Sequence, residues 1–591
     1  MRQAVSEQCT LLEGERERLR AQVEEETQRQ EEDAAEEERR RELEERSRSQ
    51  RERRRREEEE RRAREEARRE EERKEEERRR EEERRRAEER HEDERQRQAD
   101  LPMRERAFAN EVAPLLAKVR RSGKPFVDPA FAPTGTRLLP PEMRSGRQVE
   151  WRRAQAIYGR MKTLSLFGDD GLPDPDEICQ GQAGDCWFLS ALSILAMQPD
   201  LVKNVFATDE VLPLTEGGKS SGLQGESAGI FCVCFHKDGE WRPVVVDDHF
   251  PTSNRGTHLF ARSRGTELWV CVLEKAYASL HGSYAAIEGG FIEDALVDLT
   301  GGIKISPPRI EPDSSAGIET AWKQIEELAS SGKYLLGASS VRAPDGGGDS
   351  HSTRGIVHGH AYALLEVVST YPEGERLLKL RNPWGRTEWE GRWGDADMAR
   401  PENARMRAKL GWKKEDDGIF WIGWEDFVQY FRSISICMLP AHWQCASGQG
   451  EWAGATAGGC PNFDTTADNP QFLLSITQPT EVVVTLTQAD KRVGAEDDDW
   501  NHASIGLYIC TPGPGGGAIT SRNMMHRNKV TSVDRFEGAR EVTIKTSLRM
   551  RTDGSTSYVV VPMTFKPGVE NKFTLRAFSP EGGAAVELQK C

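Results

Sequence analysis

Cys186 stands where a short polar loop ends and an apolar segment begins. Residues 180–185 read QGQAGD, and residues 187–197 contain no proline. We therefore predict a tight loop that opens a helix whose first turn carries the thiol. The N–H groups and the positive dipole end of a helix N-terminus stabilise a thiolate, which is the nucleophilic form of cysteine. Taken alone, this stretch is better explained as a buried structural cysteine at a helix start.

A histidine and an asparagine further along the chain favour a catalytic cysteine over a structural one. His360 begins the apolar run HAYAL, and Asn382 follows the run LLKL. Both runs predict strands, and adjacent antiparallel strands would place the two side chains next to each other. An imidazole can hold a thiolate–imidazolium pair while an amide orients the ring, in the order Cys, His, Asn of papain-like enzymes. His358 is the rival base, but on a strand it would face the opposite side.

The side-chain amide of Gln180 can donate to the oxyanion of a tetrahedral intermediate. Together these motifs resemble those of the calpain family of cysteine proteases, from roughly residue 126 to the C-terminus. The stretches that carry the resemblance are QGxxGDCW, GHAY, RNPWG, WRPVVVDDHFP, ELWVCVLEKAY and LTGG. The resemblance implies the roles of oxyanion donor, nucleophile, base and orienter for Gln180, Cys186, His360 and Asn382. It also implies that Trp384 shields the His–Asn pair from water.

The same resemblance implies the fold class and the domain order. We expect an α+β protein with a papain-like two-lobed cysteine protease core, followed by an antiparallel β-sandwich and preceded by a long charged helix. Short β-branched or aromatic runs support the sandwich, at residues 472–476, 482–487, 505–509, 558–561 and 573–577. The expected domains are a charged extension (1–100), a lead-in segment (101–160), a first lobe with the cysteine (161–305), a second lobe with the histidine and asparagine (306–440) and the sandwich (441–591).

Residues 13–97 consist mainly of Glu and Arg in alternating blocks. Such blocks place opposite charges at helical i,i+3 and i,i+4 spacing, worth about 0.2–0.5 kcal/mol a pair. No apolar a/d seam follows Val23, so we expect a solitary solvated helix. A short coiled coil from Leu12, Leu19 and Val23, or disorder, is the alternative.

The composition of the chain excludes some classes of partner and compartment. The chain of 591 residues has a formal net charge of −16 with both signs plentiful, which argues against a nucleic-acid partner. Its eleven cysteines show no paired spacing, which indicates a reducing compartment and a cytoplasmic protein. We expect no signal peptide and no membrane span.

Calcium is the cofactor that the resemblance implies, with no organic cofactor. The matching ligand positions are Glu177 and Glu267 for a first site and Glu388, Asp395 and Asp417 for a second. The family usually has Asp where Glu177 stands. Ile419 replaces a further expected Glu, which should weaken the second site, so we expect calcium to act mainly through the first. No EF-hand loop occurs in the sequence, and therefore we expect no calpain small subunit as partner.

The preferred interpretation is a calcium-dependent intracellular cysteine endopeptidase that makes limited cuts in protein substrates. Another papain-like acyl transferase is the alternative among enzymes. A calpain-like scaffold or regulatory protein with little activity is the alternative from another class. Peripheral membrane or cytoskeletal contact is a further expectation, from the acidic loop at residues 497–499.

Overall fold

The computed structural model describes residues 101–132, 149–159, 162–168, 170–214, 227–343, 352–490, 492, 502–551, 554 and 556–591. They belong to the second of two compact units, which spans residues 93–591. The predicted charged helix and its coiled-coil alternative lie outside the described residues, as do most of a Gly-rich loop before His360 and the acidic loop.

The lead-in segment begins with a run of helical residues. Helix α3 (Leu101–Ala107) continues through a π-helical turn, η1 (Phe108–Val112), into α4 (Ala113–Ser122). Gly123 ends α4 in the left-handed conformation. After the gap, β1 (Glu150–Arg153) pairs with β5 (His249–Thr252) and leads into α6 (Ala154–Tyr158).

The described residues between 162 and 300 form what we call the helical region. Its helices are α7 (Cys186–Ala196), α8 (Pro199–Val205), α9 (Trp269–His281), α10 (Ile292–Thr300), η3 (Pro175–Glu177) and η4 (Ala285–Ile287). Its strands are β2 (Ile178–Cys179), β3 (Phe231–Lys237), β4 (Glu240–Val246) and β6 (Arg262–Ser263). Helix α7 is apolar all round and nearly every residue after Cys186 is buried, which is why the region packs around it. Asp238 and Gly239 both have positive φ, as a tight β3–β4 hairpin turn requires.

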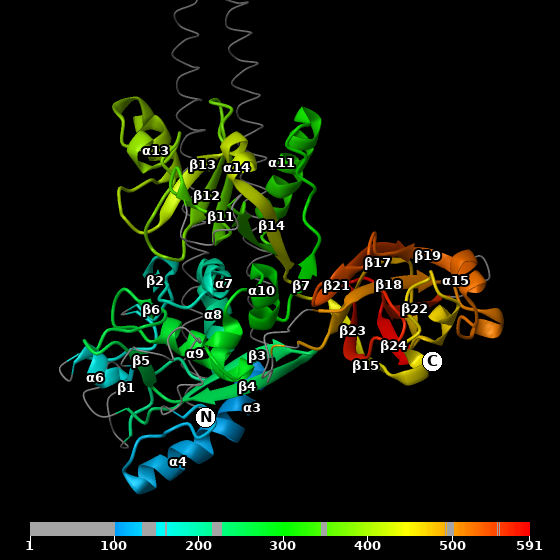
Figure 1. The fold of residues 1–591 in the computed structure, drawn as a ribbon, viewed down its shortest axis with the longest axis horizontal. Coiled ribbons are helices and arrows are strands. Elements are labelled where there is room, and N and C mark those ends of the chain that lie inside the picture. The colour runs from blue at the N-terminus through cyan, green and yellow to red at the C-terminus, as the bar shows by residue number, and fades with distance from the viewer. Residues whose placement is uncertain are drawn as a thin grey trace, which may run out of the picture. The chain divides into compact units, whose positions relative to one another are not determined.

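The sheet region, residues 303–440, is built on one antiparallel sheet of order β13-β12-β11-β8-β14-β7. Its strands are β7 (Ile303–Ile305), β8 (Tyr334–Ser340), β11 (Ala361–Ser369), β12 (Arg376–Arg381), β13 (Ile419–Gly423) and β14 (Phe431–Met438), with a small hairpin of β9 (Ser352–Thr353) and β10 (Ile356–Val357). Its helices are α11 (Ser315–Ser330), α12 (Asp395–Met398), η5 (Pro401–Asn403), α13 (Ala404–Leu410) and α14 (Trp424–Tyr430). Helix α7 packs against β8 and β11, so the two regions meet at this helix (Figure 1).

Residues from 444 onward form two antiparallel sheets that share one apolar core. One sheet has the order β15-β23-β17-β21: β15 (Gln444–Trp452), β23 (Asn571–Ser579), β17 (Thr480–Gln488) and β21 (Glu541–Leu548). The other has the order β19-β18-β22-β16-β24, with β20 beside β18: β19 (Lys529–Ser532), β18 (Ser504–Cys510), β22 (Ser557–Thr564), β16 (Phe472–Ile476), β24 (Val586–Lys590) and β20 (Glu537–Gly538). Four short helices complete it: η6 (Gly454–Thr456), η7 (Asp464–Asp468), η8 (Pro514–Gly516) and α15 (Arg522–Asn528). The predicted sandwich is confirmed.

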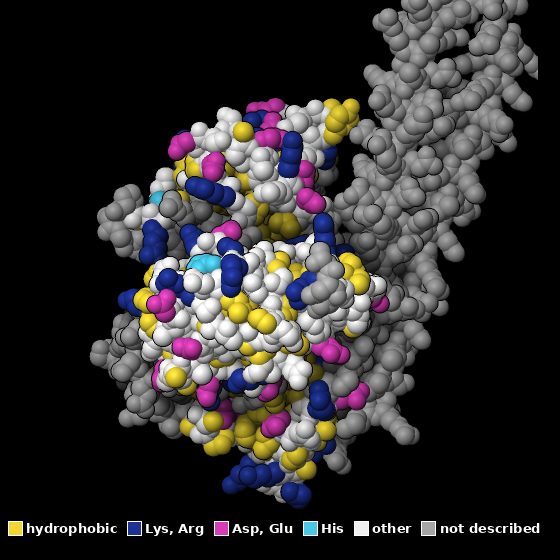
Figure 2. Space-filling model, turned by 90° about the vertical axis from the view of Figure 1, so that its right-hand side faces the viewer, with side chains coloured by type: hydrophobic (Ala, Val, Ile, Leu, Met, Phe, Trp, Pro, Cys, Tyr) yellow, Lys and Arg dark blue, Asp and Glu magenta, His cyan; other side chains and the backbone are white. Residues whose placement is uncertain are grey.

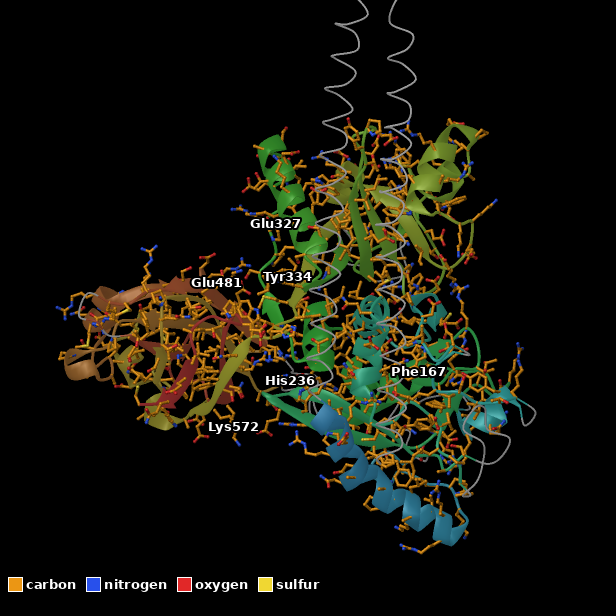
Figure 3. All side chains as sticks on the ribbon, turned by 180° about the vertical axis from the view of Figure 1, so that it is seen from behind. Phe167, His236, Glu327, Tyr334, Glu481 and Lys572 are labelled. Carbon is orange, nitrogen blue, oxygen red and sulfur yellow. The ribbon has the colours of Figure 1, made fainter. Side chains whose placement is uncertain are left out.

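The sandwich is joined to the helical region by a buried ionic cluster. Lys237 at the end of β3 lies 2.6 Å from both Asp298 and Asp490, and Arg540 lies 2.8 Å from Asp298. His236, beside Lys237, lies on the side of the helical region that faces the sandwich (Figure 3). The cluster makes this boundary polar but almost closed to water, because these side chains are at most 5% exposed.

Ten cysteines lie in the described residues, and all of them are free thiols. Within the same residues, no helix is both long and apolar enough to cross a membrane. On the face shown in Figure 2, acidic and basic side chains are interspersed.

Candidate active site

Cys186 is the first residue of α7, as predicted, and it is partly exposed. The carbonyl of Asp185 accepts from the N–H groups of Phe188 and Leu189, which starts the helix. The side chain of Asp185 does not cap the helix, although Asp is a preferred capping residue. The positive end of the α7 dipole therefore acts on the Cys186 thiol, and no Asp185 carboxylate at the cap position offsets it.

The Asp185 side chain turns instead into the core, where it lies beside the carboxyl group of Glu274 of α9. Asp185 is fully buried and Glu274 is 1% exposed. Both oxygens of Glu274 accept from the N–H of Ala261, at 3.0 and 3.1 Å. Two carboxyl groups can hydrogen-bond each other only if one carries a proton. Burial raises the pKa of Asp185 to about 7 and that of Glu274 well above its ordinary value, so the pair holds a proton at neutral pH.

The loop before Cys186 is fixed by backbone contacts on both sides. The N–H of Gln182 donates to the carbonyl of Leu259 at 2.8 Å, and the N–H of Gly289 donates to that of Gly184 at 2.9 Å. A Cβ at Gly181 would lie 2.4 Å from the backbone of Phe260, so only glycine allows this approach.

Gln180 links this loop to the segment that carries Asn382. Its backbone N–H donates to the carbonyl of Pro383 at 3.0 Å, while its side-chain Nε2 donates to the carbonyl of Ala183 at 2.8 Å. One amide N–H is thus used within the loop. The other is the one that could serve an oxyanion.

The structure brings His360 and Asn382 together as the strand pattern predicted. Strands β11 and β12 are antiparallel neighbours, and the two residues stand at adjoining ends of these strands. Nε2 of His360 lies 3.0 Å from Oδ1 of Asn382. Both residues are buried, at 1% and 0% exposure. With Nε2 engaged by the amide, Nδ1 is the ring nitrogen that can exchange a proton with a thiol.

Asn382 is itself held at both ends of its amide. Its Nδ2 donates to the carbonyl of Thr387 at 3.0 Å, and its Oδ1 also accepts from the N–H of Trp384 at 3.1 Å. The Trp384 ring centroid lies 4.9 Å from that of His360. The indole therefore covers the imidazole, in the position expected of a shield.

The reason given for discounting His358 is wrong, because residues two apart on a strand share a face, and His358 is in a turn after β10 and not on a strand. Its Nε2 lies 2.8 Å from the Thr353 hydroxyl, and its Nδ1 lies 3.3 Å from the carbonyl of Val341. These contacts anchor it in the β9–β10 hairpin rather than at Asn382.

Arg381 is a buried residue that ties the two halves of the site together. It precedes Asn382 on the chain, and its guanidinium donates to the Ser193 hydroxyl of α7 at 3.1 Å and to the carbonyl of Ile178 at 2.6 Å. Because the side chain is 0% exposed, these contacts replace water entirely. The resemblance assigned no role to this arginine.

Comparison with known proteins agrees with this geometry. The model of the calpain family cysteine protease matches residues 126–438, which is more than half of the chain. The chain belongs to the calpain family of cysteine proteases. The model of calpain large subunit domain III matches residues 448–578. The expected domain boundaries stay a prediction, since the family matches cover only parts of them.

Calpain relatives share most of this chain. It is 36% identical over 515 residues to the calpain-type cysteine protease DEK1 of Arabidopsis thaliana, covering 82% of this chain and 22% of that protein. It is 30% identical over 503 residues to the calpain-2 catalytic subunit of Gallus gallus, covering 79% of this chain and 67% of that protein. The chain thus spans about a fifth of the length of its plant relatives. A solved structure of the clostridial cysteine protease Cwp84 aligns with a TM-score of 0.18 at 11% identity, over 69% of this chain and 83% of that one, which is too weak for an argument.

The first pair of expected calcium ligands in this calpain converges on one loop. Oε2 of Glu177 accepts from the N–H of Gly265 at 3.0 Å. A Cβ at Gly265 would lie 2.4 Å from Oε2 of Glu267, so both carboxylates border the same glycine. Hard carboxylate oxygens of this kind suit calcium.

The carboxylates of the second expected set interact electrostatically, although the structure does not bring their oxygens within 4.8 Å of one another. Burial, followed by the charge of Asp395, raises the pKa of Glu388 to about 7. Burial together with the charge of Asp417 likewise raises the pKa of Asp395. Ile419 lies beside them but offers only its N–H, which donates to Asp417 at 2.8 Å. Three carboxylates that disfavour each other's ionisation are a donor set that a divalent cation would stabilise.

Proposed function

We propose that this chain is a cysteine endopeptidase with Cys186 as nucleophile, His360 as base and Asn382 as orienting residue. The observation that carries the proposal is the 3.0 Å contact between His360 Nε2 and Asn382 Oδ1. This contact leaves Nδ1 to serve the thiol at the start of α7. Family membership supports the same assignment.

Each of these residues has a role in one step of peptide hydrolysis. The Cys186 thiolate attacks the scissile carbonyl carbon, forming a C–S bond, and the carbonyl electrons move to oxygen. The second amide N–H of Gln180 and the backbone N–H of Cys186 would stabilise that oxyanion. The His360 imidazolium then protonates the leaving amine as the C–N bond breaks, and later takes a proton from the water that hydrolyses the thioester. Asn382 holds the ring, and Trp384 excludes water from their hydrogen bond.

The proposal includes the two-lobed papain-like arrangement, with the helical region as the lobe of the cysteine and the sheet region as the lobe of the histidine. The packing of α7 on β8 and β11 supports it. We further propose that the protein acts on protein substrates in the cytoplasm, where free cysteines are stable.

We also propose regulation by calcium, held by Glu177 and Glu267 at the first site. When bound there, the ion would draw the loop of Gly265 toward η3, which leads directly into the loop of Gln180. Glu388, Asp395 and Asp417 would hold a second, weaker ion because Ile419 contributes no carboxylate.

The test is cleavage of casein by the full chain and by its Cys186→Ser variant, with and without calcium. We expect wild-type cleavage to require calcium and the variant to be inactive, because serine forms an alkoxide far less readily. Gln180→Ala should lower kcat by roughly 10²–10³ with an unchanged melting temperature. Equal cleavage by Cys186→Ser and wild type would refute Cys186 as the nucleophile, whereas no cleavage by either protein would favour the scaffold alternative.

Calcium titration against a fluorogenic peptide ranks the two ion sites. Glu267→Gln should raise the calcium needed for half-maximal activity far more than Asp417→Asn does. The opposite ranking, or full activity in excess chelator, would refute regulation through the first site.

A further inference from the structure

A groove of about 810 Å³ adjoins the proposed catalytic residues. The loop from Cys179 to Gly184 forms one wall, and Trp384, Gly385 and Arg386 form another. The groove shares Gln180 with the proposed oxyanion site and Trp384 with the shield over His360. A peptide that crosses Cys186 therefore passes along this groove on the side of the imidazole.

The groove carries an excess of positive charge. Arg262, Arg264 and Arg386 line it, against a single carboxylate, that of Asp416. His258 adds no charge at neutral pH, because burial and then Arg262 lower its pKa to about 4. This excess is local, since the chain as a whole has a formal net charge of −16.

These arginines lack carboxylate partners. Nη2 of Arg264 donates to the backbone carbonyls of Gly385 at 2.8 Å and Asp416 at 3.0 Å, which fixes the side chain without neutralising it. Arg262 and Arg386 are exposed, and neither guanidinium has an ion-pair partner within the described residues. Elsewhere, the half-buried Arg376 and the exposed Arg392 do pair with glutamates.

We propose that this groove selects substrates with acidic side chains on the C-terminal side of the scissile bond. The side is set by chemistry: His360 protonates the leaving amine, so the residues that follow that amine lie next to the imidazole and its Trp384 cover. A guanidinium presents paired N–H donors that match a carboxylate, and Arg264 holds Gly385 and Asp416 in place beside Arg262 and Arg386, which bind the carboxylate. The inference rests on the proposed function, because it names the substrates of the same site.

The test measures binding separately from cleavage. The full chain with Cys186→Ser binds fluorescently labelled peptides that carry either Glu or Gln at the three positions after a casein cleavage site. We expect the Glu peptide to bind roughly three- to tenfold more tightly, as one or two partly exposed ion pairs allow. Arg262→Gln combined with Arg386→Gln should bring the ratio of dissociation constants to about one. Arg255→Gln, an exposed arginine outside the groove, is the matched control and should leave the ratio unchanged.

The dependence on salt is a second test. Raising the ionic strength should reduce the ratio of dissociation constants in the parent protein but not in the double variant. Equal binding of the two peptides, or a preference that survives the double substitution, overturns the groove proposal. Cleavage by the chain with Cys186 intact is assayed on the same peptides. A Glu preference in binding without any cleavage would support the groove while refuting the endopeptidase assignment.

Discussion

Asp185, which precedes Cys186, lies beside Glu274 in the core, whereas Asp298 and Asp490 lie at the sandwich boundary in contact with Lys237. In the described residues, no lysine or arginine forms an ion pair with the first two; Lys275, next to Glu274, is bonded to Asp247 instead. Both clusters are buried, yet one is stabilised by a shared proton and the other by counter-ions. The difference shows that burial alone does not determine the charge of a carboxyl group.

The two clusters should respond to pH in opposite directions. Burial raises the pKa of Asp185 and Glu274, so the stability that they contribute is present at low pH and is lost as pH rises through the range from about 4 to 7. Burial alone would also raise the pKa of Asp298, but Arg540 and Lys237 hold it below its ordinary value. The contribution of Asp298 is therefore present at neutral pH and is lost as pH falls below about 4.

The largest effect should come from removing a counter-ion. Lys237→Met keeps the length of the side chain but leaves two buried carboxylates with one cation fewer. We expect the free energy of unfolding of the unit to fall by about 3–5 kcal/mol at neutral pH, as for other broken buried pairs. Urea unfolding followed by tryptophan fluorescence measures it. A loss below about 1 kcal/mol would show that water reaches this cluster.

The next effect should come from neutralising the acid pair. In Glu274→Gln, an amide N–H can donate to Asp185 without a shared proton, so the decline in stability between pH 4 and 7 should flatten. We expect the difference between variant and wild type to change by a few kcal/mol across that range. Unfolding free energies at several pH values test it. Parallel curves would mean that the pair does not titrate as inferred.

A smaller effect should follow from Tyr277→Phe. The Tyr277 hydroxyl donates to Asp298 at 2.7 Å, while its ring stacks on Phe188 at 4.2 Å between centroids. Removing the hydroxyl deletes one hydrogen bond to a charged group and keeps the stacking, so about 1–2 kcal/mol should be lost. Thermal unfolding at pH 7 measures it. The loss should shrink in a Lys237→Met background if the two residues act on the same carboxylate.

The smallest effect should come from an exposed ion pair. Lys545 lies 3.2 Å from Glu481, with both side chains largely open to solvent. Lys545→Gln should change stability by less than about 1 kcal/mol, because water and salt already screen the pair. A loss of stability as large as that expected for Lys237→Met would show that buried and exposed ion pairs contribute equally in this protein.

Local patterns predicted the elements near the site well. The apolar run after Cys186 forms helix α7, and the runs after His360 and before Asn382 form the paired strands β11 and β12 as expected, because their periodicity is a strong local signal. In the sandwich, the five apolar runs are strands, but β15, β19, β20, β21 and β24 were missed. The alternating polar residues of β15 and β24 reflect edge positions that only the sheet order reveals.

Long-range polar partners could not be predicted from spacing. Nothing in the sequence around Asp185 indicates that its side chain turns away from the helix toward Glu274, since an Asp before a helix normally predicts a cap. Similarly, Arg381 reads as one charged residue between Leu380 and Asn382. Its buried contacts with Ser193 and Ile178 depend on how two separate regions pack.

Arg381 has a consequence for chain connectivity. His360 and Asn382 are joined covalently by the β11–β12 turn, but Arg381 independently fastens β12 to α7 and to the segment before Gln180. A backbone cut in that turn, near Glu373, would place the histidine and the asparagine on different polypeptides. Strand pairing and the buried guanidinium would still hold the second fragment in register against the first. Noncovalent contacts would thus keep His360 and Asn382 together even without an unbroken chain between them.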